Sequence, residues 1–100
     1  MFWQNYSIKS RDIFETDPKL RWNVADDRIV FVDEREGGLV HLEGIGSDIW
    51  RAFDGKKNVD QIVKDLQLSY DAPSGVIKND AERFIKRLFE MEYIQRVKPD

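Results

Sequence analysis

The neighbouring carboxylates that could do acid–base chemistry in this 100-residue chain lie in two predicted turns. Asp26 and Asp27 lie in one turn, and Asp33, Glu34 and Glu36 lie in another. No histidine partner, glycine-rich phosphate loop or nucleophile motif accompanies them, so we interpret them as solvated charges and not as an acid–base pair. The sequence therefore predicts no catalytic residues, and we expect that the protein is not an enzyme.

The composition also offers no set of metal ligands. The chain has no cysteine, which excludes disulfides, thiol nucleophiles and zinc–thiolate sites and fits a reducing compartment. The single histidine, His41, has no further ligand at metal-binding spacing. We therefore expect no metal and no cofactor.

Charge and hydropathy narrow the class of protein further. The chain has 16 basic and 19 acidic residues, and this net charge of -3 argues against a generic nucleic-acid binder. The aromatic segment 1–12 is interrupted by polar residues, so it is not a signal peptide, and no apolar run is long enough to cross a bilayer. We expect a cytoplasmic protein that binds neither nucleic acid nor membrane, with one domain and one core.

The first part of the chain predicts an arm and three strands. Residues 1–18 show no helical or strand period, and we interpret them as an N-terminal arm whose aromatic groups complete a thin core, with contact to a partner as the less favoured alternative. Residues 20–24 alternate as a half-buried strand, and residues 29–32 are apolar on both faces, as in a central strand covered on each side. After a turn at residues 33–38, residues 39–42 form a third strand whose edge is open.

Beyond residue 42 the apolar period becomes helical. Residues 45–53 form a short helix ended by Gly55, and Asn58 with Gln61 forms a capping box that starts a second helix. A long helix follows over residues 74–92, and residues 94–97 add a short closing strand. The long helix carries an apolar stripe that comprises Ile77, Ala81, Phe84, Leu88 and Met91. A second apolar edge beside it comprises Val76, Ile85 and Phe89.

These elements define an α+β domain over residues 19–98. A three-stranded antiparallel sheet is followed by three helices, the third of them long, and the same order describes a winged-helix core.

The order and spacing of the motifs resemble those of the PqqD-like family, the peptide-recognition domains of pathways that modify ribosomally made peptides. The resemblance covers residues 19–97. It rests on LEGIGSDIW at residues 42–50, FDGKK at 53–57, VDQIV at 59–63, and the long helix that ends in LFEMEYI at 88–94. One departure is Glu43 at the start of the first helix, where the family often has Asn, a better helix cap.

This resemblance implies a winged-helix-like fold and a non-catalytic adaptor. In that family the leader segment of a precursor peptide pairs as an added strand in the groove between the third strand and the third helix. The domain then hands the peptide to a modifying enzyme of the same pathway, commonly a radical SAM enzyme, a cyclase or a leader peptidase. An open strand edge supplies main-chain hydrogen bonds, and side-chain pockets beside it supply the sequence preference.

Carried onto this chain, the resemblance assigns one peptide-binding strand and one helical wall. The strand comprises Leu39, Val40, His41 and Leu42. The wall comprises Ile77, Ala81, Phe84, Ile85 and Leu88, with Lys78, Arg83 and Lys86 on or beside it. A stripe at this spacing is usually buried, so the apolar residues of the wall have a second interpretation as core. Lysine and arginine side chains are most often solvated.

A winged-helix DNA-binding regulator is the alternative function. Its recognition helix would be residues 74–92, which contain four basic and four acidic residues and so have no net charge. Its wing would be residues 33–38, which contain three acidic residues and one arginine. Repulsion from phosphates would offset most of the attraction. The open third strand also allows the chain to be a monomer or a weak or swapped homodimer.

Overall fold

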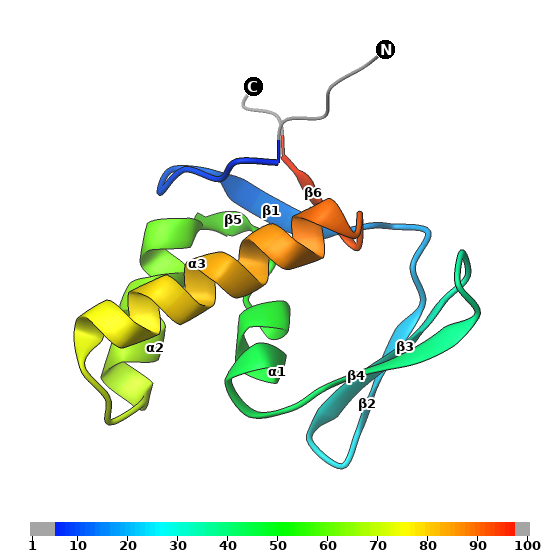
Figure 1. Cartoon of the computed structure of the whole chain (residues 1–100), viewed down its shortest axis with the longest axis horizontal. Coiled ribbons are helices and arrows are strands. Elements are labelled where there is room, and N and C mark those ends of the chain that lie inside the picture. The colour runs from blue at the N-terminus through cyan, green and yellow to red at the C-terminus, as the bar shows by residue number, and fades with distance from the viewer. Residues whose placement is uncertain (1–5, 98–100) are drawn as a thin grey trace.

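The computed structural model describes residues 6–97 of the chain, so Phe2 and Trp3 of the predicted arm lie outside the described residues. Figure 1 shows a long helix that crosses the domain between two small sheets. In chain order the elements are β1 Ile13–Thr16, β2 Trp22–Ala25, β3 Arg28–Asp33, β4 Gly38–Leu42, α1 Gly44–Arg51, β5 Asp54–Asn58, α2 Val59–Ser69, α3 Ser74–Glu90 and β6 Ile94–Arg96.

The first sheet has the strand order β2-β3-β4, which confirms that β3 is the central strand. Asp26 and Asp27 join β2 to β3 with positive φ angles of 51° and 64°, the requirement of a type I′ hairpin turn. The prediction that β3 is covered on both faces was wrong. Phe31 is buried, but Val32 on the opposite face is 51% exposed, because the helices pack on one side of the sheet only.

The second sheet, with the order β5-β1-β6, was not predicted. Its central strand is β1, which pairs with β6 through Phe14 and Arg96 and with β5 through Ile13 and Asn58. The interpretation of this segment as lacking a strand was therefore wrong. Phe14 is 1% exposed and its ring meets Phe53, which confirms that an aromatic residue from the N-terminal segment completes the core. The predicted closing strand is confirmed as β6.

The three predicted helices are present. The capping box of α2 is formed by two reciprocal 2.8 Å hydrogen bonds between Asn58 and Gln61. At α1 the N-cap residue is Glu43, whose side chain makes no capping bond, and Gly44 has a positive φ of 55° that a residue without a Cβ adopts easily. The helix starts there through the Glu43 carbonyl, which accepts from the Gly46 amide at 3.1 Å.

Aromatic side chains join the two sheets and the helices into one core. The Trp50 ring of α1 stacks on Phe31 of β3 with centroids 4.9 Å apart and meets Phe53 edge to face. The ring of Tyr93, just after α3, meets Phe31 from another side. The result is an α+β domain with three helices and two antiparallel sheets, in which α1 packs against β3. Within residues 6–97 no helix is long and apolar enough to span a membrane.

Candidate functional site

Strand β4 has one unpaired edge in the part of the chain that the structure describes. It pairs with β3 alone, and its side chains alternate between two faces. Val40 and Leu42 lie opposite the buried residues Phe31 and Ile29, so they belong to the inner face. Leu39 and His41 belong to the outer face, where Leu39 is 58% exposed. The unpaired backbone groups of β4 are therefore available to another strand.

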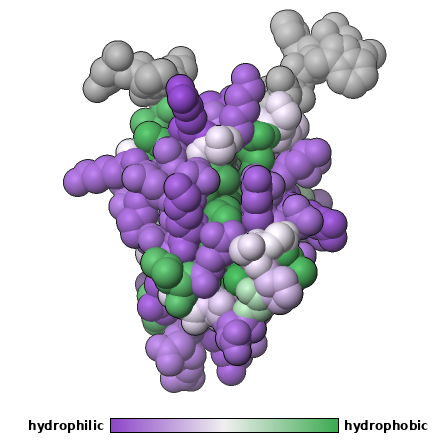
Figure 2. Space-filling model, turned by 90° about the vertical axis from the view of Figure 1, so that its left-hand side faces the viewer, coloured by the Kyte–Doolittle hydropathy of each residue, from purple (hydrophilic) through white to green (hydrophobic). Residues whose placement is uncertain are grey.

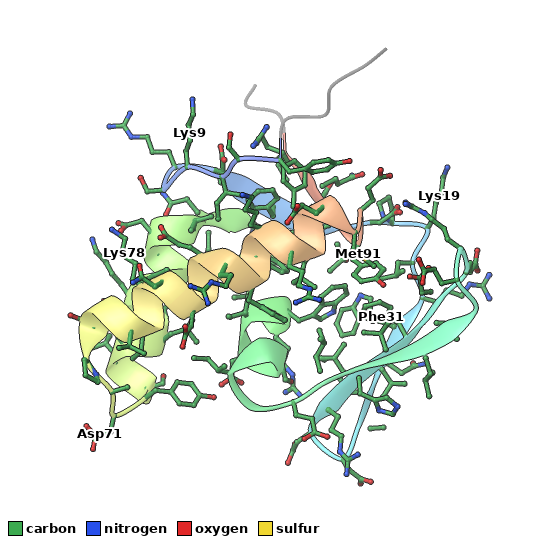
Figure 3. The ribbon with its side chains drawn as sticks, viewed as in Figure 1. Lys9, Lys19, Phe31, Asp71, Lys78 and Met91 are labelled. Carbon is green, nitrogen blue, oxygen red and sulfur yellow. The ribbon has the colours of Figure 1, made fainter. Side chains whose placement is uncertain are left out.

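The C-terminal end of β4 opens into a mainly apolar pocket of about 370 Å³ between β4, α1 and α3. A pocket of this size falls in the range of ligand sites. Its lining residues are His41, Leu42, Glu43, Ile45, Gly46, Ile49, Asp80, Ala81 and Phe84. Figure 3 shows Phe31 of β3 between the sheet and the helices, where its ring stacks on Trp50.

Phe84 is the partly buried aromatic side chain of this pocket, and its position depends on Gly46 of α1. A Cβ atom added to Gly46 would lie 3.2 Å from Phe84 Cζ, closer than most such contacts. Because residue 46 is glycine, the first turn of α1 leaves room for the Phe84 ring. This close approach sets how far Phe84 extends over the pocket.

The structure divides the predicted helical wall into pocket and core. Ala81 and Phe84 line the pocket, although Ala81 is only 1% exposed. Ile77, Ile85 and Leu88 are buried in the core at 3%, 0% and 4% exposure and do not line the pocket. Ile85, assigned from the sequence to a secondary apolar edge, lies in the middle of the buried face. The other residues of that edge are Val76, which is 50% exposed, and Phe89, which is partly buried. Met91, assigned to the main stripe, is 39% exposed.

The predicted cations do not gather at the pocket. Lys78 is six residues from Phe84, which places it about 120° away around the helix, and Figure 3 shows it on the side of α3 away from β4. Arg83 and Lys86 are exposed, and neither lines the pocket. The rim carries the carboxylates Glu43 and Asp80 instead.

Sequence reasoning missed the contribution of α1 to the pocket. Ile45, Gly46 and Ile49 line it because α1 begins just after the end of β4. That direct connection was visible in the sequence. The position of Asp80 at the pocket was also predictable, because Asp80 precedes Phe84 by four residues and so lies on the same side of α3.

The hairpin that carries β4 is fixed to the end of α3 by polar contacts. The Tyr93 hydroxyl donates to Asp33 Oδ2 at 2.7 Å, and Arg35 pairs with Glu92 at 2.9 Å. Burial, together with the hydrogen bond to Asp33, raises the pKa of Tyr93 to about 12. The Tyr93 hydrogen bond in turn holds the pKa of Asp33 below its usual value, assisted by the amides of Glu36 and Arg35 and opposed by burial. These contacts set the spacing between β4 and α3.

A second face of the molecule is mostly polar (Figure 2). Figure 2 shows the face around the α2–α3 connection, which is predominantly hydrophilic and has its hydrophobic side chains in separate groups. Among residues 6–97 no three His, Cys, Asp or Glu side chains are grouped to hold a metal ion.

Comparison with known proteins agrees with this architecture. Residues 28–94 match the family described as coenzyme PQQ synthesis protein D (PqqD), so the chain belongs to the PqqD family. Domains of this family are non-catalytic adaptors that bind peptides. A search of curated proteins gave no match.

A solved structure shares the fold. The structure described as "TbiB1 in Complex with the TbiA(beta) Leader Peptide" matches with a TM-score of 0.72 and 20% sequence identity. The match covers 85% of this chain and 99% of the other.

Proposed function

We propose that this chain binds the leader segment of a ribosomally made precursor peptide and presents it to a modifying enzyme of the same pathway. The observation that carries the proposal is the free edge of β4, which runs directly into the apolar pocket against α3. The leader would add a strand to β4, in the groove between β4 and α3. Membership of the PqqD family and a fold shared with a protein solved with a leader peptide support it.

The two parts of the site have different tasks. The backbone of β4 supplies hydrogen bonds that any extended peptide can make, so it contributes affinity without choice of sequence. The pocket beside Phe84 and Ala81 accepts one inward-facing side chain of the peptide. Burial of a large apolar side chain contributes about 1.5–3 kcal/mol, enough to select among leaders by tenfold or more.

The peptide-binding residues of the proposal are those of β4 and the adjacent wall. Leu39, Val40, His41 and Leu42 form the pairing strand, and Ala81 and Phe84 form the wall that contacts the peptide. Ile77, Ile85 and Leu88 support that wall from the core. Lys78 takes no part in the groove. The partner enzyme is of the radical SAM, cyclase or leader-peptidase class, and the adaptor acts in the cytoplasm as a monomer or a weak homodimer.

Isothermal titration with synthetic leader peptides of the short precursor genes encoded beside this one tests the proposal. We expect one-to-one binding to a leader and none to the core half of the same precursor. Phe84→Ala should weaken binding at least tenfold, whereas the control Leu68→Ala, at a side chain 88% exposed on α2, should leave affinity unchanged. A folded protein that binds no leader would overturn the proposal.

The alternative function, a winged-helix DNA-binding regulator, is the competing outcome of such a failure. The acidic rim formed by Glu43 and Asp80 disfavours it, because these carboxylates repel phosphates. If the pure protein binds no leader but retains random duplex DNA in a salt-sensitive manner, the DNA-binding function would replace the peptide-binding one.

A further inference from the structure

The pocket beside β4 combines an apolar interior with an acidic rim. Asp80 on α3 and Glu43 after β4 are both exposed and line the same pocket. Glu43 is paired with Arg28 at 3.4 Å, through side chains that are about half exposed. Asp80 has no ion pair among residues 6–97. An uncompensated carboxylate beside an apolar pocket favours a ligand in which a cation accompanies the apolar side chain.

The chain directions determine where that cation would lie. The middle of α3, at Asp80 and Phe84, faces the C-terminal end of β4. The residues after α3 contact the turn that precedes β4 through Tyr93 and Asp33. Helix α3 and strand β4 therefore run in opposite directions, as Figure 1 also shows. Antiparallel pairs are the more common kind. A peptide added antiparallel to β4 runs in the same direction as α3, so its residues before the anchor lie toward Asp80.

The spacing along the two elements agrees. Asp80 precedes Phe84 by four residues, a rise of about 6 Å along a helix. Two residues of a strand advance about 6.7 Å, and side chains two apart point to the same face. An apolar side chain level with Phe84 therefore places the side chain two residues earlier level with Asp80. A lysine or arginine at that position can reach the Asp80 carboxylate from the inner face of the added strand.

We infer that the site selects an extended peptide with a lysine or arginine two residues before its apolar anchor, recognised by Asp80. The inference rests on the proposed function and specifies its ligand: a basic–x–apolar sequence bound antiparallel to β4. The cation contributes mainly to the choice among peptides, because its pair with an exposed carboxylate is weak. Replacement of the basic residue by glutamine should lower affinity about two- to fivefold.

Selection from a display library of random 12-residue peptides on the immobilised full-length protein tests the inference, and it does not require the natural ligand to be identified. We expect enriched peptides with Lys or Arg two residues before a large apolar residue. Selection on Asp80→Lys should replace that basic residue by Asp or Glu. The control Asp71→Lys makes the same change of charge at an exposed residue of the α2–α3 connection, and it should keep the original preference.

The outcomes separate the two proposals. Enrichment of apolar strand-forming peptides with no basic residue at that position, or with one only after the anchor, would overturn the inference and leave leader binding intact. A preference that survives Asp80→Lys would also overturn it. No enrichment of any peptide by the folded protein would overturn the proposed function and the inference together.

Discussion

The Tyr93 hydroxyl donates a 2.7 Å hydrogen bond to the carboxylate of Asp33, two residues that are 60 positions apart in the chain. Tyr93 follows α3, and Asp33 ends β3 and accepts from the amides of Arg35 and Glu36 in the turn before β4. One carboxylate therefore organises the turn and is itself held by the end of α3. Because β4 and α3 form the two sides of the proposed groove, this hydrogen bond fixes their separation at one end.

Removal of the Tyr93 hydroxyl should destabilise the domain. In Tyr93→Phe the ring remains packed against Phe31, but Asp33 loses a buried donor, a change that costs roughly 1–3 kcal/mol. Urea unfolding followed by circular dichroism measures it. The control is Tyr70→Phe, which removes the more exposed bond from Tyr70 to Asp48 and should cost less. Equal losses of unfolding free energy in the two variants would show that the Tyr93–Asp33 hydrogen bond adds no more stability than the exposed one.

The same pair predicts how stability depends on pH. The pKa of Tyr93 is about 12 in the folded protein and about 10 in an unfolded chain. Its contribution is therefore complete below about pH 10 and is lost as the pH rises toward 12. The pKa of Asp33 is lowered by folding, so its contribution is present above about pH 4 and is lost in acid. Urea midpoints of the wild type and Tyr93→Phe should converge between pH 10 and 12, and parallel curves would contradict the assignment.

A methyl group at Gly46 should alter the pocket without harming the fold. The new Cβ of Gly46→Ala would press on the Phe84 ring from 3.2 Å, and the ring must move by a few tenths of an ångström. We expect peptide affinity to fall about two- to fivefold, because the anchor side chain loses part of its contact. The control Gly75→Ala adds a methyl group that meets nothing within 4 Å. It should stabilise α3 by up to about 0.5–1 kcal/mol with no change in affinity.

Strand addition to β4 predicts a periodic response to backbone methylation of the ligand. Successive amides of a strand point alternately toward and away from its neighbour, so only every second amide of the bound peptide donates to β4. Fluorescence anisotropy with a series of peptides, each N-methylated at one position, should show strong losses at alternate residues and small ones between. Uniform losses along the peptide would contradict pairing with β4.

The elements that the sequence predicts well are those with a local physical signal. The capping box at Asn58 and Gln61 defines the start of α2, and the turn of Asp26 and Asp27 separates two apolar runs. Strand β5, Asp54–Asn58, escaped prediction because it contains no apolar residue, and its place in the fold is set by backbone pairing with β1. Strand β1 has a single buried residue, Phe14, which gives no alternation to detect.

The candidate site was predictable only in outline. Sequence identified β4 as the open strand and placed Phe84 and Ala81 on the facing helix, as the structure does. Two adjoining apolar stripes on α3 leave its rotation undetermined, so the sequence pattern assigns Ile85 to an edge although it lies in the core. The acidic rim depends on how α1 and α3 approach one another across the pocket, and no local pattern encodes that distance.

The pairing of Phe14 with Arg96 has a consequence for synthesis of the chain. Strand β1 leaves the ribosome well before its partner β6, so the β5-β1-β6 sheet closes only after residues 94–96 have emerged. Contacts between such distant segments also form slowly. We therefore expect nascent chains arrested before Ile94 to be cleaved by protease in the β1 region, and released chains to become resistant within the time of sheet closure.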